Sequence, residues 1–179
     1  MHLDLSRLTG DSEHVRREYP SEAFAGSADD YRVVGPVRLE FDLSRSENRY
    51  HLVGRIEAAL QLTCSRCAEG FPWPVSAEFD LRYLPQSANV GEGELEVAEE
   101  DLGVAFYEEE SIDLGQLMRE QFYLAMPMKP LCAPGCQGLC PQCGANRNQG
   151  ECGCQVVWED PRLAPLRRLL ERREPEKGQ

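Results

Sequence analysis

The sequence has no long hydrophobic run. No stretch of its 179 residues approaches the roughly 20 consecutive apolar residues that a membrane-spanning helix requires. The start of the chain has neither a basic leader nor an apolar stretch, so it does not resemble a secretion signal. The chain also lacks a glycine-rich phosphate loop and a nucleophile motif. We therefore expect a cytoplasmic, non-enzymatic protein with no membrane partner and no small-molecule substrate.

Basic residues are few compared with acidic ones. The 19 Lys and Arg stand against 31 Asp and Glu, which gives a net charge of −12. Such a chain does not attract nucleic acid through its overall field and would sooner attract a basic protein. The charge is uneven, because residues 161–179 carry a net +3 and leave −15 on residues 1–160. A contact with a polyanion is therefore expected at the C-terminal end.

Cysteine, in contrast, is abundant. The eight cysteines form four short-spaced pairs, namely Cys64 with Cys67, Cys132 with Cys136, Cys140 with Cys143, and Cys152 with Cys154. In a cytosolic chain such clusters are more often metal ligands than disulfides. Eight thiolates suffice for two tetrahedral zinc sites with no open position, so we expect two structural zinc ions with four cysteines each. The three histidines lie outside the pairs, which disfavours a mixed catalytic site.

Two partitions of the cysteines are compatible with their spacing. In the first, the last four close a self-contained knuckle around the loop 144–151, and the first four form the other site. In the second, the middle four close a local site and the two outer pairs meet. We favour the first partition because its loop closure is the shortest. An iron–sulfur cluster also accepts four thiolates, so zinc is the preferred metal and not the sole candidate.

Alternating apolar and polar residues predict antiparallel strands in the first half of the chain. Three runs carry the pattern: residues 37–43, 50–63 and 73–83. The first cysteine pair should lie in the hairpin between the last two runs. Residues 10–30 give no clear signal.

A solvated insertion and a helix are predicted next. Residues 86–113 contain ten acidic residues and no Lys or Arg, so we expect an acidic insertion at about 86–110. Asp113 and Gln116 match a capping box, and apolar residues at helical spacing follow, which predicts a helix over 113–125. A short basic helix is expected from Pro165 onward.

Together these elements predict an α+β fold. We expect an antiparallel β-sheet or partly open barrel covered by a helix, with a C-terminal zinc knuckle and a short terminal helix. The expected domains are a β domain at 1–130, a cysteine-rich zinc-binding segment at 131–160, and a basic helix and tail at 161–179.

Several segments resemble the bacterial YceD family, whose members are called large ribosomal RNA subunit accumulation proteins. The resemblance rests on Cys64-Ser-Arg-Cys67, Met126-Pro-Met-Lys-Pro-Leu-Cys132, the stretch from Cys136 to Asn146, Cys152-Gly-Cys154, and Asp160-Pro-Arg-Leu-Ala164. It implies a cytoplasmic factor that supports accumulation or maturation of 23S-type rRNA. It also implies that the first four cysteines form the common site and the last four an optional second one.

Two functions follow from these observations. The first is a ribosome-biogenesis factor that binds 23S rRNA or the pre-ribosomal large subunit through arginines near the C-terminal end. These candidate residues are Arg147, Arg162, Arg167, Arg168, Arg172 and Arg173. The second is an acidic module that chaperones a basic ribosomal protein of the large subunit. Composition favours the second function, and the resemblance favours the first.

Overall fold

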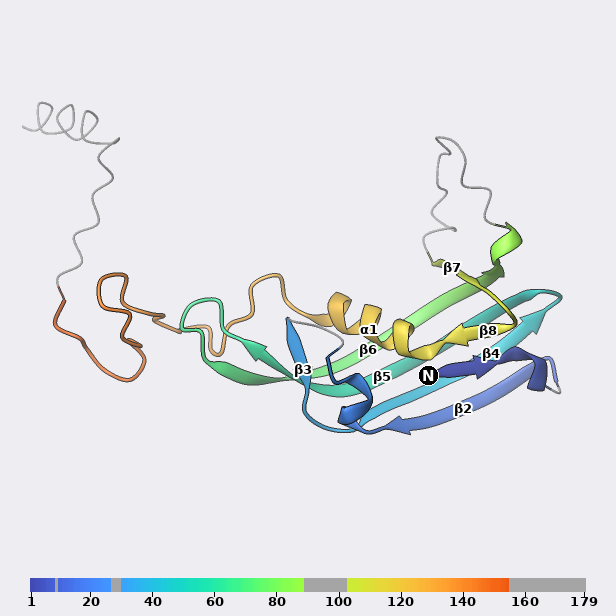
Figure 1. Ribbon diagram of the computed structural model, residues 1–179, viewed down its shortest axis with the longest axis horizontal. Helices are drawn as coiled ribbons and strands as arrows, with labels where there is room; N and C mark the ends of the chain where they lie inside the picture. The colour runs from blue at the N-terminus through green and yellow to red at the C-terminus, as the bar shows by residue number, and fades with distance from the viewer. Residues whose placement is uncertain (9, 27–29, 89–102, 155–179) are drawn as a thin grey trace, which may run out of the picture.

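A six-stranded mixed sheet dominates the computed structural model, which describes residues 1–8, 10–26, 30–88 and 103–154 (Figure 1). The strand order is β2-β4-β5-β6-β7, and β3 pairs with β5 beyond the end of β4. The strands are β2 (Ser12–Tyr19), β3 (Tyr31–Val33), β4 (Val37–Ser46), β5 (Arg49–Thr63), β6 (Gly70–Pro85) and β7 (Val104–Tyr107). Since β2 and β7 lie at opposite edges, the described sheet is open and is not a closed barrel.

A smaller layer lies on one face of this sheet. It consists of β1 (His2–Asp4), its antiparallel partner β8 (Ser111–Asp113) and the helix α1 (Leu114–Ala125). Three short 3-10 helices complete the described elements: η1 (Leu5–Arg7), η2 (Ser21–Phe24) and η3 (Gln86–Ala88). The helix packs against β6 and β1 and covers the apolar face of the sheet (Figure 1). An α+β architecture with one covering helix is therefore observed.

The three predicted strands are confirmed as β4, β5 and β6. Every second residue of β4 from Val37 to Leu43 is buried, as strict alternation requires. The register continues this apolar face across the sheet, because Leu39 lies opposite Ile56 and Leu43 lies opposite Leu52. A one-residue slip would turn the whole face toward solvent, so burial specifies the register.

The predicted helix is also confirmed, with a modified N-terminal cap. The Asp113 carboxylate accepts the N–H groups of Gly115 and Gln116 at 2.8 and 3.2 Å. The Gln116 side chain donates to Glu120 at 2.8 Å and does not return to the cap, so only half of the expected capping box forms. Phe122 anchors the other end of the helix, where it is fully buried.

The three predicted runs do not include every observed strand, and β2 and β7 show why. β2 falls in residues 10–30. Within this strand only Val15 is buried, so an edge strand of mostly polar residues gave no alternation to read. β7 lies within the predicted acidic insertion and pairs with β6 in parallel, so the expectation of a purely antiparallel sheet is wrong. Residues 89–102 of that insertion lie outside the described residues, and the domain boundary at residue 130 stays a prediction.

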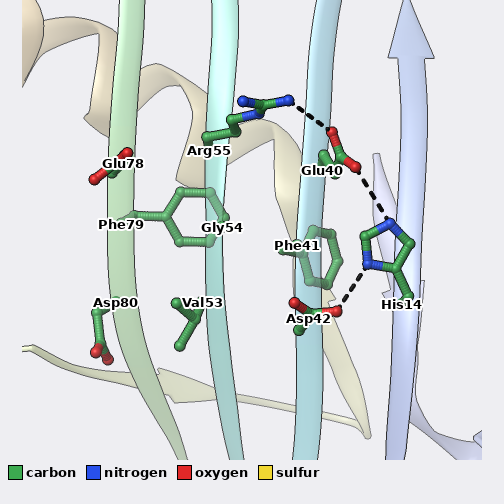
Figure 2. A pocket seen from close by; sticks show the side chains of 10 residues that line it. All are labelled: His14, Glu40, Phe41, Asp42, Val53, Gly54, Arg55, Glu78, Phe79 and Asp80. Carbon is green, nitrogen blue, oxygen red and sulfur yellow. Dashed lines mark hydrogen bonds and ion pairs between the residues drawn. The ribbon is translucent and has the colours of Figure 1, made fainter.

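The outer face of the sheet carries ion pairs between neighbouring strands. Arg16 approaches Glu40 at 2.9 Å. Figure 2 shows two further pairs, in which Arg55 lies 3.3 Å from Glu40 and His14 lies 2.8 Å from Asp42. Exposed pairs of this kind contribute at most about 1 kcal/mol each. Their main effect is to neutralise charge across this part of the face.

The β5–β6 hairpin extends beyond the end of β4. β4 pairs with β5 only as far as Glu57, and β5 continues to Thr63 before the chain turns into β6. The cysteine-rich segment lies at this end of the sheet, away from β7 (Figure 1). The fold therefore brings residues 64–69 next to a segment that follows α1.

Gly54 provides a test of the strand packing. Phe41 and Phe79 face it from the two neighbouring strands, with ring centroids 6.4 Å apart, and a Cβ at Gly54 would overlap the Phe41 Cβ. We predict that Gly54→Ala lowers the free energy of unfolding by more than about 2 kcal/mol, because β4 must shift. Chemical denaturation measures the change.

The matched control for this substitution is Gly35→Ala, where an added Cβ meets nothing within 4 Å. This control should change the free energy of unfolding by less than about 0.5 kcal/mol. Equal stabilities of the two variants would contradict the observed packing of β4 on β5.

Candidate metal centre

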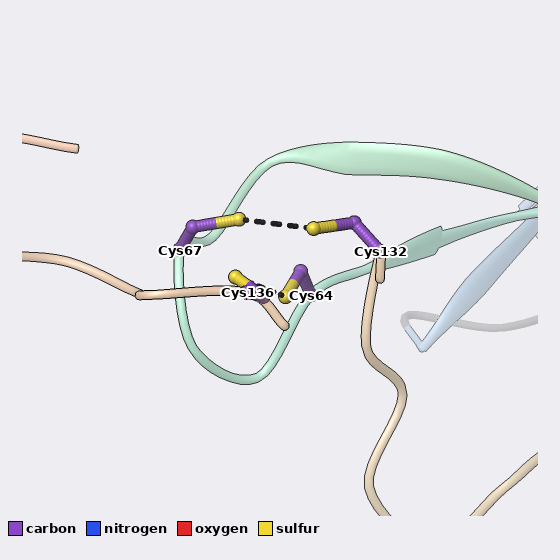
Figure 3. Close-up of side chains that lie close together, drawn as sticks. All are labelled: Cys64, Cys67, Cys132 and Cys136. Atoms are coloured by element: carbon purple, nitrogen blue, oxygen red, sulfur yellow. Dashed lines mark hydrogen bonds between the residues drawn. The ribbon is translucent and has the colours of Figure 1, made fainter. Parts of the chain in front are cut away.

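The first group of cysteines joins the β5–β6 hairpin to the chain after α1. We term it the hairpin cluster; its four Sγ atoms all lie within 4.8 Å of one another and belong to Cys64, Cys67, Cys132 and Cys136. The first two lie in the loop between β5 and β6, which confirms the predicted hairpin position. The other two arrive on the segment that follows α1 (Figure 3).

Backbone hydrogen bonds also shape this loop. The Cys64 N–H donates to the Glu69 carbonyl, and the Ala68 N–H donates to the Cys64 carbonyl, both at 2.9 Å. Ala68 adopts a φ of 58°, a conformation that glycine takes more readily. The Ser65 N–H donates to the Pro130 carbonyl at 2.8 Å, so the loop already contacts the chain that brings in the remaining ligands.

The sulfur positions fit a shared ion. Cys64 Sγ lies 3.7 Å from Cys136 Sγ, and Cys67 Sγ lies 3.6 Å from Cys132 Sγ (Figure 3). Four sulfurs bound at about 2.3 Å to a tetrahedral zinc ion are about 3.8 Å apart. A disulfide requires about 2.05 Å between its sulfurs. The observed spacing is therefore that of ligands around one ion.

The second group forms a compact knuckle at the end of the described chain. We term it the knuckle cluster; its Sγ atoms also lie within 4.8 Å of one another and belong to Cys140, Cys143, Cys152 and Cys154. Gly144 takes a φ of 74°, which lets its N–H reach the Cys140 carbonyl at 2.8 Å. The eight cysteines are thus grouped as in the first of the two partitions.

Within each cluster the thiols ionise unequally in the metal-free protein. Backbone N–H groups lower the pKa of Cys64 to about 6, whereas the side chains of neighbouring cysteines raise the pKa of Cys132 to about 12. The same contrast separates the pKa of Cys140, about 6, from that of Cys154, about 12. A cation that binds must therefore displace protons, so metal affinity should fall as the pH is lowered.

Each cluster can hold an ion but leaves no open position on it. Tetrahedral sets of four sulfurs are typical of zinc and of iron–sulfur centres. A complete set excludes a bound water or substrate, so its chemistry is to crosslink the chain. The histidines take no part: His14 pairs with Asp42 and His51 with Asp80, at 2.8 and 2.6 Å.

The predicted RNA-contacting arginines are described in part. Arg147 is exposed on the loop between the two halves of the knuckle cluster. The predicted terminal helix and the other five candidates lie outside the described residues, namely Arg162, Arg167, Arg168, Arg172 and Arg173.

Sequence reasoning missed two asparagines on this loop. Asn146 donates to Glu69 at 3.3 Å, and Asn148 donates to Cys136 Sγ at the same distance. From sequence, the loop 144–151 was expected to close the knuckle and to carry Arg147. The sequence feature that could have indicated these contacts is the pair of amide side chains two residues apart, because amide N–H groups can donate to sulfur.

Fold and clusters together define an α+β protein with two four-cysteine sites suited to structural metal. The chain belongs to the YceD family: the profile described as "Large ribosomal RNA subunit accumulation protein YceD" matches residues 52–170. The resemblance drawn from the cysteine motifs is therefore confirmed. The match includes both clusters, β6 and α1.

Curated relatives come from plants and mycobacteria. An Arabidopsis thaliana protein named "Large ribosomal RNA subunit accumulation protein YCED homolog 1, chloroplastic" is 24% identical over 98% of this chain and 61% of its own length. The Zea mays protein of the same name is 28% identical over 67% of this chain and 49% of its own. A Mycobacterium tuberculosis protein, named only as uncharacterized, is 33% identical over 66% of this chain and 55% of its own.

The chain thus spans between 49% and 61% of the length of these relatives. No solved structure matches it. In the part of the chain that the structure describes, no helix is both long enough and apolar enough to cross a membrane.

Removal of metal should affect the clusters and the sheet differently. We predict that a chelator under reducing conditions speeds amide hydrogen exchange in residues 64–69 and 132–150. Residues 49–57 of β5 should stay protected, because the sheet has a hydrophobic core of its own. Hydrogen-exchange mass spectrometry measures both regions, with chelator pre-saturated with zinc as the control. Unchanged exchange in the cysteine-rich regions would contradict a metal crosslink there.

Proposed function

We propose that this chain is a non-enzymatic ribosome-biogenesis factor of the cytoplasm that supports accumulation or maturation of 23S-type rRNA. The family match over residues 52–170 carries this proposal, since the family description refers to accumulation of large-subunit ribosomal RNA. Two plant relatives bear the same description in their names. In this proposal each cluster holds one zinc ion through its four cysteines, and the ions shape a binding surface without taking part in a reaction.

The described residues offer one surface suited to an RNA backbone. Ion pairs neutralise the arginines in the middle of the outer sheet face, but Arg49 and Arg82 have no carboxylate partner among the described residues. Both border a groove of about 550 Å³ at the end of the sheet near the β4–β5 turn. Arg45 also lines the groove, with its guanidinium 5.8 Å from the centre of the Tyr50 ring. Uncompensated positive charge in a groove favours phosphate groups.

The groove and the arginines near the C-terminal end would be two separate contact sites for one RNA. Arg147 is exposed on the knuckle loop, at the opposite end of β5 from Arg49. Contacts at both ends would let an RNA segment follow the sheet over its length. Because such contacts neutralise phosphates, binding should weaken steeply with salt.

The alternative is that the acidic body binds a basic ribosomal protein and affects rRNA indirectly. The net −15 on residues 1–160 favours this second function. The two proposals differ in which molecule is lost when particular charges are reversed, so one experiment separates them.

The test is crosslinking of the full-length protein in cells, with and without nuclease, followed by identification of the bound molecules. We predict that the double variant Arg49→Glu, Arg82→Glu loses crosslinks to 23S rRNA, as does the variant with Arg167, Arg168 and Arg172 changed to Glu. With purified components, each lost phosphate contact should lower the slope of log affinity against log salt by about 1.

The matched control for the groove is the double variant Arg32→Glu, Lys129→Glu, which makes the same charge change at two exposed positions elsewhere. It should retain its crosslinks. A ribosomal protein that survives nuclease and is lost when residues 92–110 are neutralised would replace the RNA proposal with the chaperone proposal. Turnover of RNA by the pure protein would overturn the non-enzymatic assignment.

A further inference from the structure

The loop of the knuckle cluster does not stand apart from the hairpin cluster. Residues 144–151 lie between two ligand pairs of the knuckle cluster, yet they fold back along the chain that leads into it. The Arg147 N–H donates to the Gly138 carbonyl at 2.9 Å, and Asn146 forms a β-bridge with Leu139. The loop therefore reaches the segment that carries the last ligand of the hairpin cluster. The expectation of a self-contained knuckle is corrected here.

Asn148 makes the contact between the two clusters. Its side-chain Nδ2 donates to Cys136 Sγ at 3.3 Å. Its Oδ1 accepts the Gln137 N–H at 2.8 Å. Since a backbone N–H can only donate, this second bond sets the orientation of the amide and directs the NH₂ group toward the sulfur.

Neighbouring groups hold Asn148 in this position. The Asn146 Oδ1 accepts both the Asn148 N–H and its Nδ2, at 3.0 and 2.8 Å. Asn146 in turn donates to Glu69 at 3.3 Å, beside the loop that supplies Cys64 and Cys67. The two asparagines thus connect Cys136 with the β5–β6 hairpin, and both of these belong to the hairpin cluster. The asparagines themselves belong to the loop of the knuckle cluster.

A hydrogen bond to a ligand sulfur matters because four thiolates carry more charge than one divalent ion neutralises. A donor withdraws part of the excess charge and orients the ligand. Groups of this kind in metal sites typically change metal affinity by roughly 10- to 100-fold. The loop that carries Asn148 ends at two ligands of the knuckle cluster, Cys143 and Cys152.

We propose that the two clusters bind their ions as a coupled pair, with Asn148 as the positioning residue. Binding of an ion in the knuckle cluster closes the loop 144–151 and holds the Asn148 amide against Cys136, which raises the affinity of the hairpin cluster for zinc. By thermodynamic linkage, zinc in the hairpin cluster raises the affinity of the knuckle cluster by the same factor. The coupling presupposes the zinc ions of the proposed function, but it does not depend on what the protein binds in the cell.

The coupling can be measured on the full chain by competition between protein and a chelator for zinc. We expect the variant Cys143→Ser, Cys152→Ser to bind one ion, with the affinity of the hairpin cluster reduced by about tenfold or more. Asn148→Ala should bind two ions and show a similar loss at the hairpin cluster. Combining the three changes should weaken that cluster by less than about twofold beyond the double variant, because the contact is already lost.

Two further variants separate positioning from simple packing. Asn148→Asp keeps the acceptor for the Gln137 N–H but replaces the NH₂ donor with a carboxylate oxygen beside sulfur, so it should weaken the hairpin cluster more than Asn148→Ala does. Gln149→Ala is the matched control; its side chain takes no part in the contacts described above, and both affinities should stay unchanged. With cobalt in place of zinc, Asn148→Ala should move the sulfur-to-metal charge-transfer band to longer wavelength, because the sulfur loses a donor.

Each outcome decides between coupling and independence. The coupling would be overturned if each cluster bound its ion with an affinity that did not change on loss of the other cluster. It would also be overturned if the effects of Asn148→Ala and of losing the knuckle cluster on zinc affinity were fully additive. Both results would leave the zinc sites intact. A protein that binds no ion would instead remove the zinc premise. An Asn148→Asp variant as tight as the unaltered protein would exclude the N–H to sulfur contact as the cause.

Discussion

Mutual repulsion among thiolates within 4.8 Å of one another is the constraint on which the cysteine-rich part of this protein depends. The sulfur neighbours of Cys132 keep its thiol protonated, whereas backbone N–H groups favour ionised Cys64. A divalent cation reverses this balance by converting four repelling groups into four ligands. Because 64 residues separate Cys67 from Cys132, the closure also joins two distant parts of the chain.

The sheet determines where this closure takes place. β5 and β6 extend past β4, so their hairpin carries the cluster away from the ion-paired middle of the outer face. The groove beside Arg49 and Arg82 lies at the other end of the same strands. At about 3.3 Å per residue, the 15 residues of β5 separate the two ends by roughly 45 Å. An RNA that reached both ends would therefore have to extend along the whole sheet.

The central strands, the helix and the grouping of the cysteines could be predicted from sequence, because each depends on a pattern of residues that are close together in the chain. Alternation in β4 and β5 reports burial directly, and Asp113 marks the start of α1 through its capping bonds. Short loop closure was enough to favour the observed grouping of the cysteines. β2 escaped prediction because an edge strand needs little apolar surface, and the parallel pairing of β7 depends on a tertiary contact with β6. The Asn148 contact escaped for a similar reason, since it requires the two clusters to lie side by side.

The metal content and X-ray absorption spectrum of natively purified protein test the proposed zinc sites. We expect two equivalents of zinc per chain, each with four sulfur ligands at about 2.3 Å and no nitrogen or oxygen ligand. A protein that contained no bound metal while residues 64–69 and 132–150 remained protected from hydrogen exchange would contradict this expectation. So would a zinc spectrum with a mixed ligand set.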